Sequence, residues 1–257
     1  MSDELIQVDR SHAGIAVLTL QRAEKRNALN VVLLQQLASA VEHLKQDPGC
    51  RVLILRGDGP VFCAGLDLVE ASDARLAEES AEGVRHILSL LQESPLIVIA
   101  AAHGAAMAGG AGLLAVSDLV VAADNLKLGF PEVRRGLVAA LVSGPLARKI
   151  RGGDLRELLL LGEPITAMRA QQMGLVQWIV PSDQVLEHAL NLARRVLAGG
   201  PDAVRETKRL LYQDPTAVDL GFLKALHERV RHGCEAREGL AAFRERREPN
   251  WRQNSEG

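Results

Sequence analysis

The segment 103–122, HGAAMAGGAGLLAVSDLVVA, combines four glycines with a single histidine at its start. Gly109 and Gly110 stand where an apolar helix is expected to begin. The first N–H groups of a helix have no partner within the helix and lie at the positive end of its dipole, so they favour a developing negative charge. This pattern predicts a site whose reactive groups belong to the main chain.

Two further segments could complete such a site. The segment 60–68, PVFCAGLDL, places an Ala-Gly turn directly after a predicted strand and loop. The segment 129–136, GFPEVRRG, presents the carboxyl group of Glu132 between apolar residues. A carboxyl group in such surroundings has a raised pKa and suits general acid or base work. We therefore expect the pKa of Glu132 to be raised.

Each of these features has a simpler interpretation. Glycine-rich turns also serve close packing, and a glutamate after proline often marks the start of a helix. The glycines do not fit the G-x-G-x-x-G pattern of dinucleotide sites. Cys63 with His103, or Ser143, could be imagined as a nucleophile, but no nucleophile elbow surrounds them and we expect none of these roles.

The composition excludes several classes of function. The net charge of −2 and the aromatic content of 3% do not favour nucleic acid or an anionic membrane as a partner. Cys50, Cys63 and Cys234 are far apart, which fits a reducing compartment and offers no zinc spacing. The first ten residues lack the basic and apolar regions of a secretory signal. We expect a cytoplasmic protein without a metal site.

The run 96–116 is long enough to cross a bilayer, and His103 is its only clearly polar residue. It is dominated by alanine and glycine, and no lysine or arginine stands just outside it. A buried strand, turn and helix explain this run better than a membrane span.

Apolar, β-branched runs recur at 14–20, 51–57, 95–101 and 118–124, and each predicts a strand. Helical patterns lie between them, one after the N-cap candidate Asn30 and one over 72–94. Strands that alternate with helices indicate an α/β fold with buried parallel strands.

The sequence becomes mainly helical after about residue 142, with one strand candidate at 175–181. We expect 217–247 to form a charged amphipathic helix whose apolar stripe needs a partner. The predicted organisation is an α/β core over 1–195 and a helical oligomerisation region over 196–257.

Five segments in a fixed order carry a resemblance to a known family. The segments are KRNALN (25–30), VFCAGLDL (61–68), HGAAMAGGAGLLAVSDLVVAAD (103–124), FPEVRRGLV (130–138) and GEPITAMRAQQMGLVQWIVP (162–181). With these segments in this order, the chain resembles the enoyl-CoA hydratase/isomerase family of the crotonase superfamily over nearly its whole length. The resemblance implies the crotonase (ClpP/crotonase-like) fold of repeated ββα units, with a helical C-terminal region that forms trimers or dimers of trimers.

The resemblance also implies roles for single residues. The amides of Leu66 and Gly109 would polarise the carbonyl group of an acyl-CoA thioester and hold the enolate oxygen that follows. Coenzyme A is then part of the substrate, and no separate cofactor is expected. Its phosphates could meet Lys25, Arg26 or a C-terminal basic residue. The residues expected to contact coenzyme A are Arg26, Ala28, Ala64, Asp67 and Leu68.

The chain departs from the family at the acid/base position. Hydratases of the family place two glutamates against one water; here the first position is Gly112, and only Glu132 remains. Ala139 and Ala140 also replace a Pro-Gly pair that is common in the family. The segment 131–143 resembles bacterial methylglutaconyl-CoA hydratases.

A single carboxyl group can support hydration or double-bond isomerisation. We favour reversible hydration of a 2-enoyl-CoA, with a branched or carboxylated acyl group as one option. Arg134 or Arg135 could pair with a distal carboxylate, or could be ordinary surface residues. The alternatives are a Δ3,Δ2-enoyl-CoA isomerase, a decarboxylase of a malonyl-type thioester, and a catalytically silent acyl-CoA-binding subunit. The acyl pocket is expected between the helix at 70–90 and the segment 137–146.

Overall fold

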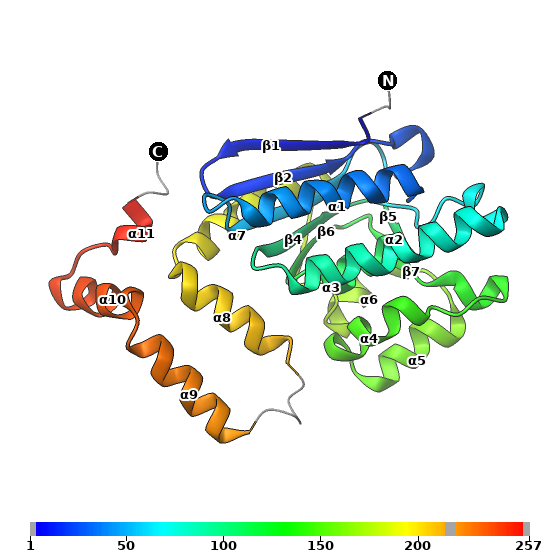
Figure 1. Cartoon of the computed structure of the whole chain (residues 1–257). Coiled ribbons are helices and arrows are strands. Elements are labelled where there is room, and N and C mark those ends of the chain that lie inside the picture. Colours follow the sequence, from blue (N-terminus) through cyan, green and yellow to red (C-terminus); the bar gives the residue numbers. More distant parts are fainter. Residues whose placement is uncertain (1–3, 214–218, 254–257) are drawn as a thin grey trace.

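Apolar runs form the central sheet of the chain (Figure 1). A computed structural model describes residues 4–213 and 219–253 of the chain. The order of the six strands in the central sheet is β1-β2-β3-β4-β6-β9. The last five strands in this order, β2, β3, β4, β6 and β9, run parallel to one another. The residues of β4 are buried on both faces, which explains its continuous apolar run. The four predicted strands are confirmed as β2 (Ile15–Leu20), β3 (Val52–Gly57), β4 (Ile97–Ala102) and β6 (Leu119–Ala123), and the fifth candidate contains β9 (Trp178–Val180).

The edge strand β1 (Ile6–His12) is not evident from the sequence. It pairs antiparallel with β2, and five of its seven residues are exposed. An edge strand with a polar, exposed surface lacks the alternating apolar pattern by which strands are recognised.

Helices cover both faces of this sheet. One face packs against α1 (Val31–Gln46), α2 (Ala74–Glu93) and α3 (Gly109–Val116), and the other against α7 (Val185–Leu197). Asn30 caps α1 as predicted, because its side chain accepts the N–H of Leu33 at 3.0 Å. The core is therefore a three-layer α/β arrangement (Figure 1).

A small second sheet adjoins α3. It consists of β5 (Ala105–Met107), β7 (Lys127–Gly129) and β8 (Ile165–Thr166). The run 96–116 thus forms β4, β5 and α3, as expected. Within residues 4–213 and 219–253, no helix combines the length and hydropathy needed to span a bilayer.

Short helices connect these parts. Four of them are 3₁₀ helices, and three are α-helices around the second sheet. They are η1 (Ala23–Lys25), η2 (Glu70–Ser72), η3 (Pro131–Arg135), η4 (Ser182–Gln184), α4 (Ala140–Lys149), α5 (Gly152–Leu161) and α6 (Ala167–Met173).

The C-terminal helices extend from this core (Figure 1). They are α8 (Pro201–Leu211), α9 (Leu220–Arg231), α10 (Cys234–Glu245) and α11 (Asn250–Gln253). Helix α7 ends two residues beyond the boundary predicted at 195. The prediction of one helix over 217–247 is wrong for the part that the structure describes, because the chain turns at Gly233 between α9 and α10, and glycine is a poor helix former. Residues 217 and 218 lie outside the described residues.

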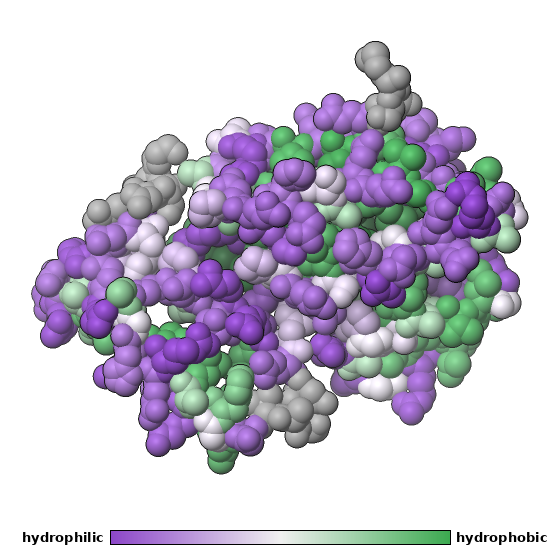
Figure 2. All heavy atoms as spheres, in the orientation of Figure 1, coloured by the Kyte–Doolittle hydropathy of each residue, from purple (hydrophilic) through white to green (hydrophobic). Residues whose placement is uncertain are grey.

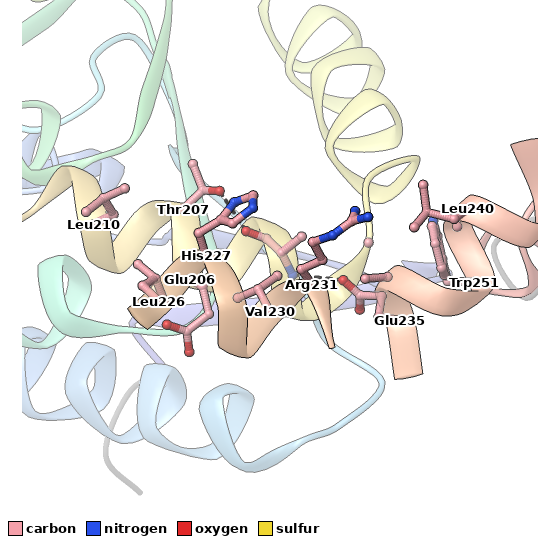
Figure 3. Close-up of a pocket in the computed structure, with 14 residues that line it drawn as sticks. Glu206, Thr207, Leu210, Leu226, His227, Val230, Arg231, Glu235, Leu240 and Trp251 are labelled. Carbon is pink, nitrogen blue, oxygen red and sulfur yellow. Dashed lines mark hydrogen bonds between the residues drawn. The ribbon is translucent and has the colours of Figure 1, made fainter. Parts of the chain in front are cut away.

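A groove of about 480 Å³ lies among the C-terminal helices (Figure 3). Side chains of α8, α9 and α10 point into it, among them Thr207, His227 and Leu240, and Trp251 closes one end. Helix α9 has no buried residue, and α10 has one, Ala242. This region therefore buries little apolar surface within its own chain.

Candidate active site

The two turns predicted to supply main-chain donors lie side by side. A parallel bridge joins Cys63 to Ala106. In this bridge the N–H of Cys63 donates to the carbonyl oxygen of Ala105 at 3.1 Å, and the N–H of Met107 donates to that of Cys63 at 3.0 Å. Main-chain bonds thus hold segments 61–68 and 103–110 together, although 34 residues of sequence lie between them.

Gly65 allows these turns to touch. Its φ is +92°, a conformation that favours glycine. A Cβ placed on Gly65 would lie 2.7 Å from the carbonyl oxygen of Met107 and 3.0 Å from the Cβ of Ala108. No other residue fits between the turns without displacing one of them.

The amide of Leu66 is left free of the bridge that fixes its turn. Leu29 pairs with this turn by donating its N–H to Gly65 at 2.7 Å and accepting the N–H of Asp67 at 3.0 Å. In a parallel bridge of this kind, the residue between the two bonds directs its own N–H away from the partner strand. The N–H of Leu66 therefore points away from Leu29.

Gly109 is the first residue of α3, so its N–H has no partner within the helix. The preceding residue, Ala108, has φ +48° and ψ −119°. A non-glycine residue in such a region costs about 1–3 kcal/mol and is retained where the surrounding structure imposes it. The N–H of Ala108 donates to the carbonyl oxygen of Gly129 at 2.8 Å, and its carbonyl oxygen accepts the N–H of Gly112 at 2.9 Å.

Asn27 secures the loop at 25–30 against the first donor turn. It is fully buried, and its side-chain nitrogen donates to the carbonyl oxygens of Asp58 and Val61 at 2.8 and 2.9 Å. Its side-chain oxygen accepts the N–H of Arg22 at 2.9 Å. Sequence reasoning missed this role of Asn27. The available signal was an asparagine in a turn, which tolerates the positive φ of +53° found here.

A partly buried ion pair also holds this turn. Arg22 donates to the carboxylate of Asp67 at 2.6 Å and to the carbonyl oxygen of Ala28 at 2.9 Å. Burial acts to raise the pKa of Asp67, but the guanidinium of Arg22 and the N–H of Val69 hold this pKa below its usual value. Arg22 was not singled out from the sequence, and the carboxylate of Asp67 serves the turn itself.

The other residues expected to contact coenzyme A lie along this loop. The carbonyl oxygen of Arg26 accepts the N–H of Ala64 at 3.0 Å, and the side chain of Arg26 is exposed. Ala28 and Ala64 are half-buried, and Leu68 is exposed. The structure thus pairs the loop of Arg26 and Ala28 with the turn that carries Ala64 and Leu68, and their contact with coenzyme A stays a prediction.

Glu132 lies in η3, which follows β7. Its Oε2 atom is buried and has no hydrogen-bond partner among the described residues. Burial raises the pKa of Glu132, as its apolar neighbours predicted, while a main-chain N–H and the charge of Arg135 oppose this increase. The raised pKa makes this carboxyl group better suited to accept and return a proton.

Glu132 is tied to the second donor turn through β7. Gly129, the last residue of β7, accepts the N–H of Ala108, and η3 begins two residues later. One short segment therefore positions both the carboxyl group and the peptide that carries the N–H of Gly109.

Comparison with known proteins identifies the family of the chain. A model of the family "Enoyl-CoA hydratase/isomerase" matches residues 10–254. The chain belongs to this family.

Relatives and solved structures agree with this assignment. A Thermus thermophilus protein provisionally named enoyl-CoA hydratase is 39% identical over 96% of this chain and all of the relative. The 2,3-dehydroadipyl-CoA hydratase of Escherichia coli is 34% identical over 93% of this chain and 95% of the relative. An enoyl-CoA hydratase/isomerase structure from Marinobacter aquaeolei aligns with a TM-score of 0.90 and 31% identity, covering 97% of this chain and all of that one. These comparisons confirm the predicted family, fold and enzyme class.

Within this family fold, Val142 occupies the space beside Gly112. A Cβ on Gly112 would lie 2.7 Å from Cγ1 of Val142 and 3.5 Å from a methyl group of Leu88. A glutamate at position 112 would therefore collide with α4. The packing in this region fits a site with one carboxyl group.

The alternative nucleophiles are engaged with the main chain. The thiol of Cys63 donates to the carbonyl oxygen of Asn27 at 3.1 Å, and burial raises the pKa of Cys63 to about 12. His103 is hydrogen-bonded to the carbonyl oxygen of Gly59, and the hydroxyl of Ser143 donates to that of Ala140. These contacts fit the expectation that none of the three acts as a nucleophile or base.

Arg134 is already occupied. It donates to the carbonyl oxygen of Leu161 at 2.8 Å and forms an ion pair with Glu163 at 2.5 Å. Of the two arginines considered for a distal carboxylate, Arg135 is the one whose charge acts on Glu132. Over the described ranges, no group of three or more His, Cys, Asp or Glu side chains could hold a metal ion.

The far end of α3 is closed by side chains. Lys149 donates to the carbonyl oxygens of Leu114 and Ser117, and the hydroxyl of Tyr212 donates to that of Val116 at 2.9 Å. Burial lowers the pKa of Lys149 to about 8, partly offset by Asp118. A cation at this position complements the negative end of the helix dipole.

Proposed function

We propose that this enzyme reversibly hydrates the double bond of a 2-enoyl-CoA, with the N–H groups of Leu66 and Gly109 binding the thioester oxygen and Glu132 moving the proton. One observation carries the proposal. The unpartnered, buried carboxyl oxygen of Glu132 lies on the segment that also anchors the donor peptide of Gly109.

The proposed reaction needs no group beyond these. Glu132 takes a proton from water as the water oxygen bonds to C3, and the electrons of the double bond pass to the thioester oxygen. The two main-chain donors stabilise this enolate, and each preorganised donor contributes about 3–4 kcal/mol. Glu132 then gives its proton to C2, which completes the addition of one water molecule. No cofactor or metal is required.

The surface near Glu132 supports an apolar acyl group. Val133, Leu137, Val138 and Leu141 are all exposed, Val138 by 80%. Figure 2 shows apolar atoms gathered where Figure 1 places α4 and α5. With Arg134 in an ion pair, a carboxylated acyl group would depend on Arg135.

The names of relatives favour hydration over isomerisation. One relative is a mevalonyl-CoA hydratase from Aspergillus fumigatus, 32% identical over 93% of this chain. Another, from Mycosarcoma maydis, is named as both an isomerase and a hydratase. Assays with separate trans-2 and cis-3 substrates distinguish hydration from isomerisation.

The test supplies trans-2- and cis-3-enoyl-CoA thioesters separately to the wild-type enzyme and to Glu132→Gln. Hydration is expected to remove the absorbance of the conjugated thioester, whereas isomerisation of the cis-3 substrate would create it. Loss of the general base is expected to lower kcat about 10²–10⁴-fold. Glu163→Gln, which removes a carboxylate from an exposed ion pair, is the matched control. Turnover no faster than the uncatalysed reaction in both proteins would favour the silent acyl-CoA-binding alternative, and equal catalysed turnover in both would show that Glu132 does not move the proton.

A homotrimer or dimer of trimers is also proposed. Helices α9 and α10 bury almost nothing within the chain, and Leu220 and Phe243 are both more than 80% exposed. Analytical ultracentrifugation would contradict this proposal if it showed only monomers. Free Cys50, Cys63 and Cys234 are compatible with a cytoplasmic location.

A further inference from the structure

We propose that Ala108 is a positioning residue whose methyl group sets the spacing of the two donor turns and the direction of the Gly109 N–H. The inference rests on the proposed function, since it assigns Leu66 and Gly109 as the donors. It concerns a residue with no reactive group.

The backbone of Ala108 differs from that of Arg26 and Arg246, two other non-glycine residues with positive φ. Arg26 and Arg246 have φ 54° with ψ 36° and 40°, which is the ordinary left-handed region. Ala108 combines φ 48° with ψ −119°. An L side chain rarely adopts this combination, and glycine adopts it without a steric penalty. The unfavourable conformation therefore lies directly before the proposed donor.

Three contacts hold Ala108 in this conformation. Its N–H donates to Gly129 of β7, and its carbonyl oxygen accepts the N–H of Gly112 in the first turn of α3. Its methyl group faces Gly65, where an added Cβ would be only 3.0 Å away. The methyl group of Ala108 thus fills the space that Gly65 leaves open between the turns.

The peptide between Ala108 and Gly109 carries the proposed donor, and the ψ of Ala108 sets the direction of that N–H. A glycine at position 108 would relieve the steric conflict but would leave a gap opposite Gly65. The peptide could then rotate, and the donor would be aligned for only part of the time. The methyl group therefore lowers the stability of the fold while it improves the site.

This predicts opposite effects of Ala108→Gly on stability and turnover. The melting temperature is expected to stay unchanged or rise by about 1–4 °C, because relief of the strain exceeds the added freedom of the unfolded chain. The value of kcat is expected to fall about tenfold or more, with a smaller change in KM, since an aligned donor matters most in the transition state. A purely structural role would move stability and turnover in the same direction.

Ala40→Gly, in the middle of α1, is the matched control. It removes the same methyl group from an ordinary helical position, so it should lower the melting temperature and leave kcat unchanged. If Ala108→Gly keeps full kcat, or loses kcat and stability together, the proposal is wrong.

A second measurement separates this outcome from a failure of the proposed function. A cinnamoyl-CoA thioester absorbs at longer wavelength as its carbonyl group becomes polarised, with or without turnover. Wild type is expected to shift this band, Ala108→Gly to shift it less, and Glu132→Gln to shift it as wild type does. If wild type shifts the band but turns over no enoyl-CoA substrate, the hydratase proposal is wrong, and a smaller shift in Ala108→Gly would still support the role of Ala108. If wild type and Ala108→Gly shift the band equally, only the role of Ala108 is wrong.

Discussion

The two ends of α3 differ in whether side chains of the protein bond their free main-chain groups, which are carbonyl oxygens at one end and N–H groups at the other. At the C-terminal end, Lys149 and Tyr212 donate to the last carbonyl oxygens, so the helix is closed by its own protein. At the N-terminal end, Gly109 follows a strained alanine, and its N–H has no partner within the helix. A helix end without a protein partner is available to a ligand. The difference fits the proposal that the N-terminal end acts on substrate, while the contacts at the C-terminal end fix the helix.

The largest effect is expected at the N-terminal end, for Gly65→Ala. The new Cβ would lie 2.7 Å from the carbonyl oxygen of Met107, so the donor turns must separate. Loss of one aligned donor should lower kcat/KM about 10²–10³-fold in a steady-state assay. Gly174→Ala, at an almost identical φ of +94° far from the donor turns, should lose stability and keep its activity. Similar activity losses in both variants would mean that backbone strain, and not the donor spacing, is responsible.

A smaller effect is expected in the middle of α3, for Gly112→Glu. Its side chain would collide with Val142, which should lower the free energy of unfolding by about 1–3 kcal/mol, as overpacked cores do. Val142→Ala in the same chain should restore part of this loss. Urea denaturation of the single and double variants measures both values. A Gly112→Glu enzyme as stable as wild type would show that Val142 does not block the family's first glutamate position.

The smallest effect is expected at the C-terminal end and concerns pH. Burial favours the neutral form of Lys149 in the folded state, so between pH 8 and the usual lysine value of 10.5 the unfolded chain binds more protons. The free energy of unfolding should therefore rise with pH across this window, by about 1–3 kcal/mol from this group. Lys149→Met should flatten the rise, and exposed Lys224→Met should not. An equal slope in wild type and Lys149→Met would show that the ammonium group is not desolvated.

The sequence was sufficient for the buried parts of the molecule. Strands such as β4, covered on both faces, and helices with a capping residue, such as α1, follow from local pattern and were predicted. The edge strand β1 was not predictable in this way, because its exposed residues carry no apolar signal. Gly233 marked a break between α9 and α10 that the charged amphipathic pattern concealed.

The candidate site likewise contains some features that the sequence predicts and others that it does not. Glu132 and its raised pKa could be expected from one apolar segment, and the glycines at 109 and 110 indicated a main-chain site. The pairing of Leu66 with Gly109 as donors to one oxygen came only through the family resemblance. The clamp by Asn27, the pair of Arg22 with Asp67, and the packing of Val142 against Gly112 join residues 30 or more positions apart. The strain at Ala108 is a backbone angle that tertiary contacts impose. Apart from the asparagine in a turn at position 27, none of these has a local signature.

The placement of the carboxyl group on η3 has an evolutionary consequence. Gly109 is buried and Leu66 packs against the core, whereas η3 is five residues long and contains no residue that is buried as a whole. Substitutions there can add, remove or re-aim an acidic group without unravelling the framework that carries the proposed donors. Descendants of such a scaffold could exchange one reaction for another by altering a handful of surface positions, and the ancestral oxygen-binding apparatus would pass through the transition intact.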